Sequence, residues 1–216
     1  MAFERARNEE NKKIRLEQIK TAAKKLFDEL DYHEISLSKI GNEINFTRGN
    51  LYKYVKSKED IYLYVIIDEM TNFVDDLESN LIKEEKLDTK ILAHKWATIL
   101  AKHPRYLKLF SILFTILEKN SNLDLLTDFK NQLVIIQTRM FAVFKHNIPE
   151  FNNDDIIKLI ELYSAFIIGQ YPICNPSDIQ REATERSNFD YTFPDFIENF
   201  SEAPVLLING IKLSKM

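Results

Sequence analysis

The strongest concentration of groups that can bind a charged partner lies between residues 48 and 58. This stretch holds cations and tyrosines with no acid between them: Arg48, Tyr52, Lys53, Tyr54, Lys56 and Lys58. Guanidinium and ammonium groups form charge-assisted hydrogen bonds with phosphate, and tyrosine hydroxyls donate to the same oxygens. The stretch therefore has the chemistry of a nucleic-acid contact, whereas the competing interpretation is a solvated basic helix face. The elements around it decide between the two.

Those elements are predicted to be two short helices joined by a tight turn. Ser36 caps a helix predicted over Leu37–Ile44. Asn45 tolerates the left-handed conformation that reverses the chain, and Thr47 supplies a hydroxyl cap for the second helix, Arg48–Val55. The second helix of such a pair can lie in the major groove of DNA.

The positions of the polar residues give them different predicted roles on DNA. The N-terminal half of the second helix reaches base edges, so Arg48 or Lys53 can read guanine and Asn50 can read adenine. Later residues contact phosphates, which positions the protein without specifying sequence. Hydroxyl and backbone N–H groups at the start of the first helix bind phosphate too, and a glycine lets backbones approach closely. The predicted DNA-binding residues are Ser36, Ser38, Thr47, Arg48, Gly49, Asn50, Tyr52, Lys53, Tyr54, Lys56 and Lys58.

Catalytic chemistry finds little support in the sequence. The histidines are scattered, without the spacing of metal ligands: His33, His94, His103 and His146. Cys174 follows an apolar stretch and is interpreted as a small buried side chain. The paired acids are adjacent in sequence, so they point to different sides of a helix. We therefore predict no catalytic residue, no metal, no cofactor and no enzymatic function.

Composition favours an all-α chain in a reducing compartment. Among 216 residues only four are glycine and six are proline, so long stretches run without a helix breaker. A single cysteine excludes an intramolecular disulfide framework. No signal segment is recognised, and the richest apolar stretch, residues 156–173, is interrupted by Lys158 and Glu161. We expect a cytoplasmic protein with no membrane partner.

Charge is distributed unevenly along the chain. The net charge is −4, yet residues 1–60 carry 13 Lys and Arg against 11 Asp and Glu, so the acidic excess lies in the remainder. A mildly basic head on an acidic body directs the head toward phosphate. Residues 1–11 are polar and are predicted to form a flexible arm.

The rest of the chain is predicted to form helices, with no internal repeat and no strand-like alternation. Apolar residues recur at steps of three and four. The predicted helices are Ile14–Leu30, Lys58–Ile82, Leu87–Ala101, Pro104–Lys119, Leu123–His146, Ile156–Tyr171, Asp195–Phe200 and Glu202–Leu213, with a polar loop over Pro172–Pro194.

An ordered set of motifs runs through residues 12–65. It comprises the helix Ile14–Leu30, then Tyr32, Ile35-Ser36, Ile40, the turn Thr47-Arg48-Gly49, Leu51-Tyr52-Lys53-Tyr54 and Ser57-Lys58-Glu59-Asp60. This set resembles the DNA-binding head of the TetR family of bacterial repressors. The sequence departs from the family pattern with Asn45 where Gly is usual and with Val55 where Phe is usual.

The resemblance implies an all-α fold with an N-terminal helix-turn-helix three-helix head and a C-terminal helical bundle. The head would be residues 1–56, and residues 57–216 would bind an effector and dimerise. It implies a homodimeric repressor that a small-molecule effector releases from a palindromic double-stranded operator. The alternative is a DNA-binding regulator that is controlled by a protein partner and has no small-molecule effector.

The body holds more aromatic residues than a plain bundle requires. Aromatic residues at helical spacing are usually core, and a ligand pocket lined by some of them is the competing interpretation. Few cations in the middle of these helices favour an apolar or weakly polar ligand. The candidate ligand-binding residues are Trp96, Tyr106, Phe110, Phe114, Phe141, Phe144, Tyr163 and Phe166.

Two segments, residues 156–168 and 204–211, carry more apolar surface than one core needs. In the TetR family the last two long helices of each subunit meet their symmetry mates in a four-helix interface. The resemblance therefore implies a dimer interface, and the candidate residues are Ile156, Ile160, Ile167, Leu206 and Leu207. The competing interpretation places these helices at the centre of a monomeric bundle.

Overall fold

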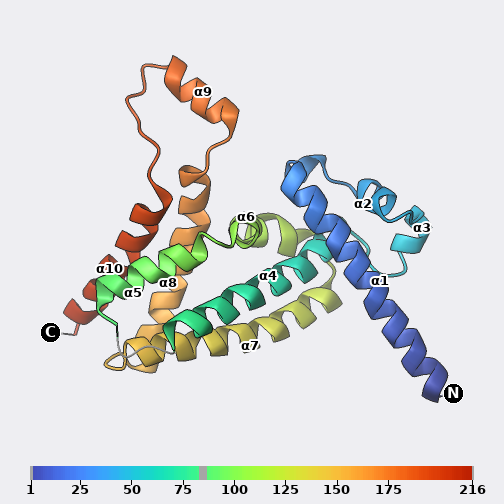
Figure 1. The fold of residues 1–216 in the computed structure, drawn as a ribbon, viewed down its shortest axis with the longest axis horizontal. Helices are drawn as coiled ribbons and strands as arrows, with labels where there is room; N and C mark the ends of the chain where they lie inside the picture. The colour runs from blue at the N-terminus through green and yellow to red at the C-terminus, as the bar shows by residue number, and fades with distance from the viewer. Residues whose placement is uncertain (1, 83–86, 216) are drawn as a thin grey trace. The chain divides into compact units, whose positions relative to one another are not determined.

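The computed structural model describes residues 2–82 and 87–215, and within these ranges the chain forms helices and no strand (Figure 1). The prediction of an all-α fold is confirmed. The helices are α1 (Ala2–Glu29), α2 (Leu37–Glu43), α3 (Arg48–Leu51), α4 (Lys58–Leu81), α5 (Thr89–Leu100), α6 (Pro104–Ile112), α7 (Leu123–Asn147), α8 (Asn153–Cys174), α9 (Asp178–Arg186) and α10 (Phe196–Leu213). Shorter turns are the 3₁₀ segments η1 (Tyr32–Glu34) and η3 (Glu118–Asn120) and the π-helical segment η2 (Leu113–Leu117).

The chain divides into two compact units. Unit 1 comprises Met1–Asp68 and Leu113–Leu133, and unit 2 comprises Glu69–Ile112 and Val134–Met216. Compactness therefore assigns the segment from η2 to the first half of α7 to the unit that holds the helix-turn-helix. The domain boundary after residue 56, which the family resemblance implied, stays a prediction.

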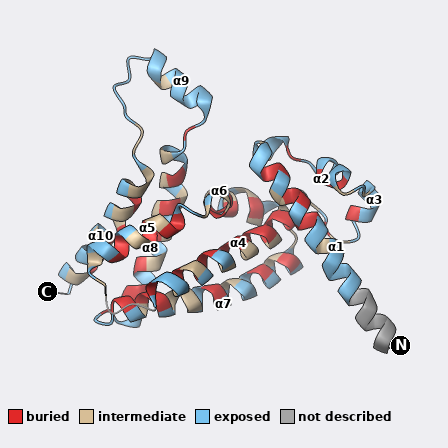
Figure 2. Cartoon of the chain, viewed as in Figure 1, coloured by how far each residue is buried: buried red, intermediate tan, exposed pale blue. Residues whose placement is uncertain are grey.

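In unit 1, one stripe of α1 is buried (Figure 2). Its members recur at steps of three and four, as an amphipathic helix requires: Ile19, Ala22, Ala23, Leu26 and Phe27. The buried Tyr62 of α4 donates its hydroxyl to the backbone oxygen of Ala23 at 3.1 Å, and its ring lies 5.2 Å from that of Phe27. A three-helix head therefore rests on the start of α4.

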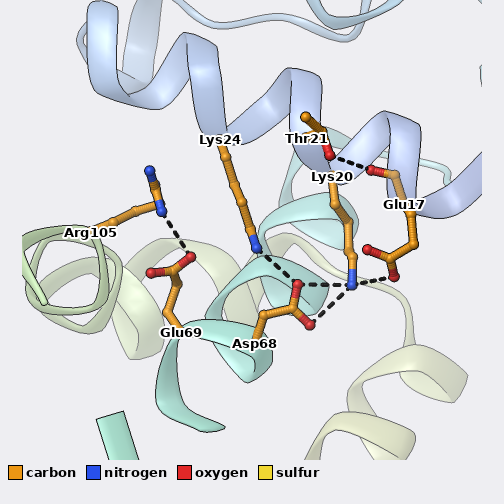
Figure 3. A network of polar contacts seen from close by, with 7 residues as sticks. All are labelled: Glu17, Lys20, Thr21, Lys24, Asp68, Glu69 and Arg105. Atoms are coloured by element: carbon orange, nitrogen blue, oxygen red, sulfur yellow. Dashed lines mark hydrogen bonds and ion pairs between the residues drawn. The ribbon is translucent and has the colours of Figure 1, made fainter. Parts of the chain in front are cut away.

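A cluster of charges also holds α1 to α4 (Figure 3). The ammonium groups of Lys20 and Lys24 reach one carboxylate, Asp68, with shortest distances of 2.8 and 3.0 Å. Glu17 adds a further ion pair to Lys20 at 2.6 Å. The side chain of Lys20 is only 9% exposed, so its charge needs these partners. In unit 2, Arg105 pairs with Glu69 at 2.9 Å.

The N-terminal segment differs from the prediction. Residues 1–11 were expected to form a flexible arm, but α1 begins at Ala2. Residues 2–29 contain no Gly and no Pro and are rich in Ala, Glu, Lys and Arg, which favour helix strongly enough to extend it.

The core of unit 2 is aromatic. The ring of Trp96 on α5 lies 4.1 Å from Phe144 on α7 and 4.2 Å from Tyr163 on α8. The buried hydroxyl of Tyr163 donates to the backbone oxygen of Phe200 on α10 at 2.8 Å. These contacts join four helices around one cluster of rings. Aromatic pairs stabilise a fold by more than their buried area alone accounts for.

Three helical boundaries in the second half of the chain correct the sequence prediction. α10 is one helix with Pro204 inside it, because its buried residues Phe200, Ile208 and Ile211 pack along a continuous face. The helix expected over Pro104–Lys119 ends at Ile112 and continues in π and 3₁₀ form. The expected loop over Pro172–Pro194 contains α9, whose start has a capping box at Ser177.

Candidate nucleic-acid interface

The helix-turn-helix forms through the local contacts that its sequence predicts. The Ser36 hydroxyl accepts a hydrogen bond from the backbone N–H of Lys39 at 3.2 Å and so caps α2. The Thr47 hydroxyl accepts one from the N–H of Asn50 at 3.3 Å and caps α3. Asn45 has a φ of 55°, which is the left-handed conformation expected of it. The caps and the turn are confirmed.

A glycine that sequence reasoning missed sets the distance between α2 and the turn. A Cβ atom on Gly41 would lie 2.8 Å from the backbone oxygen of Phe46 and 3.0 Å from Leu51 Cδ1. The Gly41 oxygen accepts a hydrogen bond from Phe46 N–H at 2.9 Å. A Cβ on Gly49, in contrast, would meet no atom of the protein within 4 Å. No neighbouring atom therefore requires a glycine at position 49, and its role in close approach to DNA stays a prediction.

The α-helical part of the second helix is shorter than predicted. α3 covers Arg48–Leu51 instead of Arg48–Val55. After it, Lys53 N–H bonds to Asn50 and Tyr54 N–H to Leu51, both three residues back. Val55 N–H then bonds to the Leu51 oxygen, four residues back, at 3.1 Å. Val55 lies in the core, where it is 3% exposed, and α4 begins three residues later.

Most of the predicted DNA-binding residues gather on the surface of the turn and of the segment 47–56, hereafter the recognition segment. Those that are exposed are Ser36, Ser38, Thr47, Arg48, Gly49, Asn50, Tyr52, Lys53 and Lys56. Tyr54 is half-buried, with its ring 6.5 Å from that of Phe46. Nearly all of the predicted set is therefore exposed to solvent at α2 and the recognition segment.

Arg48 and Tyr52 act as a pair on this surface. Arg48 donates from Nε and Nη2 to the Tyr52 hydroxyl at 3.1 and 2.9 Å, and the guanidinium lies 5.4 Å from the ring centroid. The pair holds both side chains on one side of α3 and leaves the other guanidinium hydrogens available to an acceptor such as guanine or phosphate.

Lys58 makes contacts within the protein that its sequence position did not predict, and its phosphate contact stays a prediction. Its ammonium donates to the backbone oxygens of Tyr32 at 2.8 Å and Ile35 at 2.9 Å, and it lies 4.1 Å from the centroid of the Tyr32 ring. Burial lowers the pKa of this ammonium. Because two of its three N–H groups satisfy carbonyls of the link between α1 and α2, Lys58 holds that link to α4.

Two further polar groups in unit 1 were not found from the sequence. The Tyr32 hydroxyl donates to Glu59 at 2.8 Å, and burial together with this carboxylate raises the pKa of Tyr32 well above its usual range. Asp60 is buried and accepts hydrogen bonds on both oxygens. Both acids lie in the motif Ser57–Asp60, which signals a helix start but does not reveal these distant partners.

The candidate ligand-binding residues fall in both units and differ in burial. Five are buried in unit 2: Trp96, Tyr106, Phe110, Phe144 and Tyr163. Phe141 and Phe166 are half-buried in the same unit. Phe114 belongs to unit 1 and is 48% exposed, with Lys130 5.6 Å from its ring centroid. One buried polar atom in the aromatic core of unit 2, Trp96 Nε1, has no hydrogen-bond partner among the described residues.

The candidate dimer residues also differ in how far they are exposed. Ile156 and Ile167 are 0% and 4% exposed, so they belong to the chain's own core and cannot line an intermolecular surface. Leu206 is 63% exposed, and Ile160 and Leu207 are half-buried. A groove of about 310 Å³ lies beside Ile160 in unit 2, lined by Val134, Gln137, Thr138, Phe141, Ile157, Ile160 and Glu161. We call it the α7–α8 groove.

The exposed apolar positions make α8 unusual. By length and composition α8 is long and apolar enough to cross a membrane. Its qualifying window of 18 residues has a mean hydropathy of 1.3, and 28% of that window is buried. Lys158 and Glu161, which interrupt the apolar stretch, therefore do not remove α8 from the helices that meet this criterion. A single helix of this kind is weak evidence for a membrane span, because core helices of other proteins have the same composition.

Several charged side chains of unit 2 pair with one another. His103 Nε2 lies 2.9 Å from the Asp76 carboxylate, and Arg139 bonds Glu78 and Asp75 at 2.6 Å each. Within residues 2–82 and 87–215, no three His, Cys, Asp or Glu side chains gather as metal ligands do.

A helix-turn-helix with an exposed basic recognition segment, joined to a helical body, defines the class of DNA-binding transcriptional regulators. Family comparison makes the assignment specific. Residues 19–65 match the family described as bacterial regulatory proteins, tetR family, and residues 68–215 match the tetracyclin repressor-like C-terminal domain. The chain belongs to the TetR family, whose members are DNA-binding transcriptional regulators and not enzymes.

Individual relatives show what the chain is similar to. It is 30% identical over 110 residues to the fatty acid metabolism regulator protein of Bacillus subtilis, a match that covers 51% of this chain and 49% of that protein. It is 28% identical over 179 residues to an HTH-type transcriptional regulator of Staphylococcus aureus, covering 72% of this chain and 91% of that protein.

Solved structures share the fold. The fatty acid degradation regulator FadR from Bacillus halodurans aligns with a TM-score of 0.58 at 17% identity, covering 90% of this chain and 95% of that one. FadR from Bacillus subtilis, solved in complex with stearoyl-CoA, aligns with a TM-score of 0.50 at 23% identity, covering 89% of this chain and 97% of that one.

Proposed function

We propose that this TetR-family regulator is a homodimeric repressor that binds a palindromic operator and is released by a small-molecule effector. The observation that carries the proposal is the recognition segment, whose exposed Arg48, Asn50 and Lys53 lie together on a scaffold of caps and buried anchors. These residue types bind base edges bidentately or through amide pairs. We assign base contacts to Thr47, Arg48, Asn50 and Lys53.

Phosphate contacts are proposed for the residues on either side of these. Tyr52, Tyr54 and Lys56 follow the base-reading positions, and Ser36 and Ser38 begin α2. Such contacts fix the register of the protein on the duplex and supply salt-dependent affinity. Lys58 is left out of this set because its ammonium is used within the protein.

Dimerisation is proposed from the apolar surface that unit 2 leaves exposed. Ile157, Leu162 and Leu206 are 47%, 42% and 63% exposed, and the α7–α8 groove lies beside the first of them. Exposed apolar residues in such number indicate association. A second copy of the chain would cover them and would present two recognition segments to two half-sites, as two-fold operators require.

The proposed effector is a ligand with a long apolar chain, and a fatty acyl-CoA is the first candidate. The support is the relative named for fatty acid metabolism and the structural neighbour that binds stearoyl-CoA. In unit 2, Trp96 Nε1 is a buried donor without a described partner, which a polar atom of a ligand can satisfy. The close ring contacts around Trp96 favour the second candidate, a regulator with no small-molecule effector.

Selection of bound sequences from random duplexes tests the proposal. We expect inverted repeats, a dimer in light scattering, and loss of the complex on addition of stearoyl-CoA. Recovery of no preferred sequence at moderate salt would overturn the function as a specific regulator. An operator complex that stearoyl-CoA leaves intact, while palmitoyl-CoA and free fatty acids also fail, would favour control by a protein partner. We also expect the protein in the soluble cytoplasmic fraction, with no membrane partner.

A further inference from the structure

A buried carboxylate lies directly behind the recognition segment. Asp60 is 1% exposed, and its Oδ2 atom accepts hydrogen bonds from the backbone N–H groups of Lys56 at 2.8 Å and Ser57 at 3.2 Å. The Ser57 hydroxyl in return accepts from Asp60 N–H at 3.1 Å. On this side, Asp60 completes a capping box at the start of α4 and holds the end of the recognition segment.

The other oxygen of Asp60 reaches a remote part of the chain. Oδ1 accepts from the Ser121 hydroxyl at 2.7 Å, from Asn122 Nδ2 at 3.2 Å and from Asn122 N–H at 3.4 Å. Asn122 Oδ1 accepts from Leu125 N–H at 3.0 Å and so caps α7. One side chain therefore joins the end of the recognition segment to the residues that begin α7.

A local capping role accounts for only half of these contacts. A capping box needs one carboxylate oxygen, whereas Oδ1 bonds residues that lie 61 and 62 positions away. A buried carboxylate is costly unless its oxygens are satisfied, and hydrogen bonds to a charged acceptor are stronger than neutral ones. The link to residues 121 and 122 is thus strong enough to couple the two segments.

Residues 121 and 122 are assigned differently by family match and by compactness. Residues 121 and 122 fall within the match to the C-terminal domain of the family, residues 68–215. By compactness they belong to unit 1 with the helix-turn-helix, and η2, a π-helical segment, opens this stretch at Leu113. π-helical turns are rare and occur frequently at functional sites. A segment of the C-terminal domain therefore packs with the DNA-binding unit and bonds to it through Asp60.

We propose that Asp60 is a positioning residue for DNA binding, which fixes the end of the recognition segment to the 121–122 segment through its two oxygens. The orientation of the recognition segment then depends on a part of the chain that belongs to the C-terminal family domain. The inference rests on the proposed function, because it requires specific binding to a duplex. It adds a residue that touches no DNA to the set that determines operator affinity.

Ser121→Ala is the sharpest variant, because it removes one hydrogen bond to Oδ1 and leaves the capping box untouched. The matched control is Thr127→Ala, which removes an exposed hydroxyl on α7 that bonds only within its own helix, to the Leu123 oxygen. Hydrogen exchange by mass spectrometry reports on the amides of Lys56 and Ser57. Fluorescence anisotropy measures affinity for the selected operator.

We expect Ser121→Ala to increase deuterium uptake in a peptide spanning residues 52–60 and to weaken operator binding by about tenfold. Thr127→Ala should change neither. Asp60→Asn, which places amide hydrogens against the donors, should produce larger changes of the same kind. Circular dichroism should show that all three variants keep their helices, since a merely structural loss would lower helicity instead.

Each of the remaining outcomes overturns the proposal. Unchanged uptake in residues 52–60 with Ser121→Ala would reduce Asp60 to a local helix cap. Increased uptake with unchanged operator affinity would show a coupling that does not position the recognition segment. If the wild-type chain selects no duplex, the proposed function fails and the positioning role fails with it, whereas a wild-type chain that selects an operator to which Ser121→Ala binds with unchanged affinity contradicts the positioning role alone.

Discussion

The recognition segment and the α7–α8 groove are both exposed, but they expose opposite chemistry. The recognition segment presents cations, amides and hydroxyls on a framework fixed by caps, by Asn45 and by the buried Leu51 and Val55. The groove presents the apolar side chains of Val134, Phe141, Ile157 and Ile160 beside Gln137, Thr138 and Glu161. Water satisfies exposed polar groups until a charged partner replaces it, whereas exposed apolar area is stabilised only when another apolar surface covers it.

The comparison indicates two kinds of partner for one chain. A polar surface on a rigid framework loses little by staying free, so it can bind and release an operator. A large apolar surface favours a partner that stays bound, as in obligate homodimers, whose interfaces are more apolar than transient ones. Changes that reverse the chemistry of one surface should therefore leave the other intact.

The largest effect is expected from a charge at the apolar surface. Ile160→Glu in the groove, or Leu206→Glu on α10, would place an unpaired carboxylate in the proposed dimer interface at a cost of about 3–5 kcal/mol. Light scattering should show monomers at micromolar concentration, and operator affinity should fall with the loss of the second recognition segment. Circular dichroism should still show a folded helical chain.

Ile179→Glu is the control for that prediction. Ile179 is 74% exposed on α9, away from the groove residues, so its variant should remain a dimer with unchanged DNA affinity. Dimers of normal affinity in both Ile160→Glu and Leu206→Glu would place the interface elsewhere.

The next largest effect is expected within the helix-turn-helix, from its two glycines. Gly41→Ala would force a Cβ to within 2.8 Å of the Phe46 oxygen, and overpacking of this kind costs about 1–3 kcal/mol. Gly49→Ala has open space around its new Cβ, so it should leave folding unharmed or stabilise α3 by about 0.5–1 kcal/mol. Thermal unfolding of the two variants separates them.

For operator affinity of the folded protein we expect the opposite order, with a larger loss in Gly49→Ala than in Gly41→Ala. Gly49→Ala is expected to weaken operator binding, because its methyl group projects from an exposed position of the recognition segment. If Gly49→Ala binds the operator as tightly as the wild-type chain, the predicted close approach at residue 49 is wrong.

The parts of the fold that sequence predicts correctly are those set by near neighbours. Ser36, Thr47 and Asn45 act on amides or dihedrals within three residues of themselves, so residue type and spacing are sufficient. The apolar stripe of α1 follows from its own period in the same way. The helix-turn-helix and its caps could be placed from the sequence for this reason.

The contacts that sequence does not predict have partners far along the chain. Lys58 bonds carbonyls 23 and 26 residues away, and nothing in a basic stretch predicts such contacts. Asp60 and Asp68 have partners 44 to 62 residues away. α8 is apolar on most sides, so its period does not say that Ile156 faces the core while Ile157 is exposed.

Within the recognition segment, loss of a base contact and loss of a phosphate contact should affect DNA binding differently. Asn50→Ala should cost about 1–3 kcal/mol at particular base pairs and relax specificity there. Lys56→Ala should weaken binding to every duplex alike and reduce the slope of log K against log salt by about one. Anisotropy titrations at several salt concentrations, against the selected operator and single-base variants of it, distinguish these patterns. A change in sequence preference with Lys56→Ala would contradict the assignment.

The smallest effect is expected on unfolding free energy, where Lys58→Ala and Lys56→Ala should differ because only the Lys58 ammonium bonds within the protein. Lys58→Ala removes two hydrogen bonds to the carbonyls of Tyr32 and Ile35, and because the ammonium is only partly buried the loss of unfolding free energy should be about 1 kcal/mol. Lys56 is exposed, so Lys56→Ala should leave that free energy unchanged. Urea unfolding measures both. Since the Lys58 ammonium bonds within the protein, its variant should keep the wild-type salt slope, and a slope reduced as far as in Lys56→Ala would return Lys58 to the DNA-binding set.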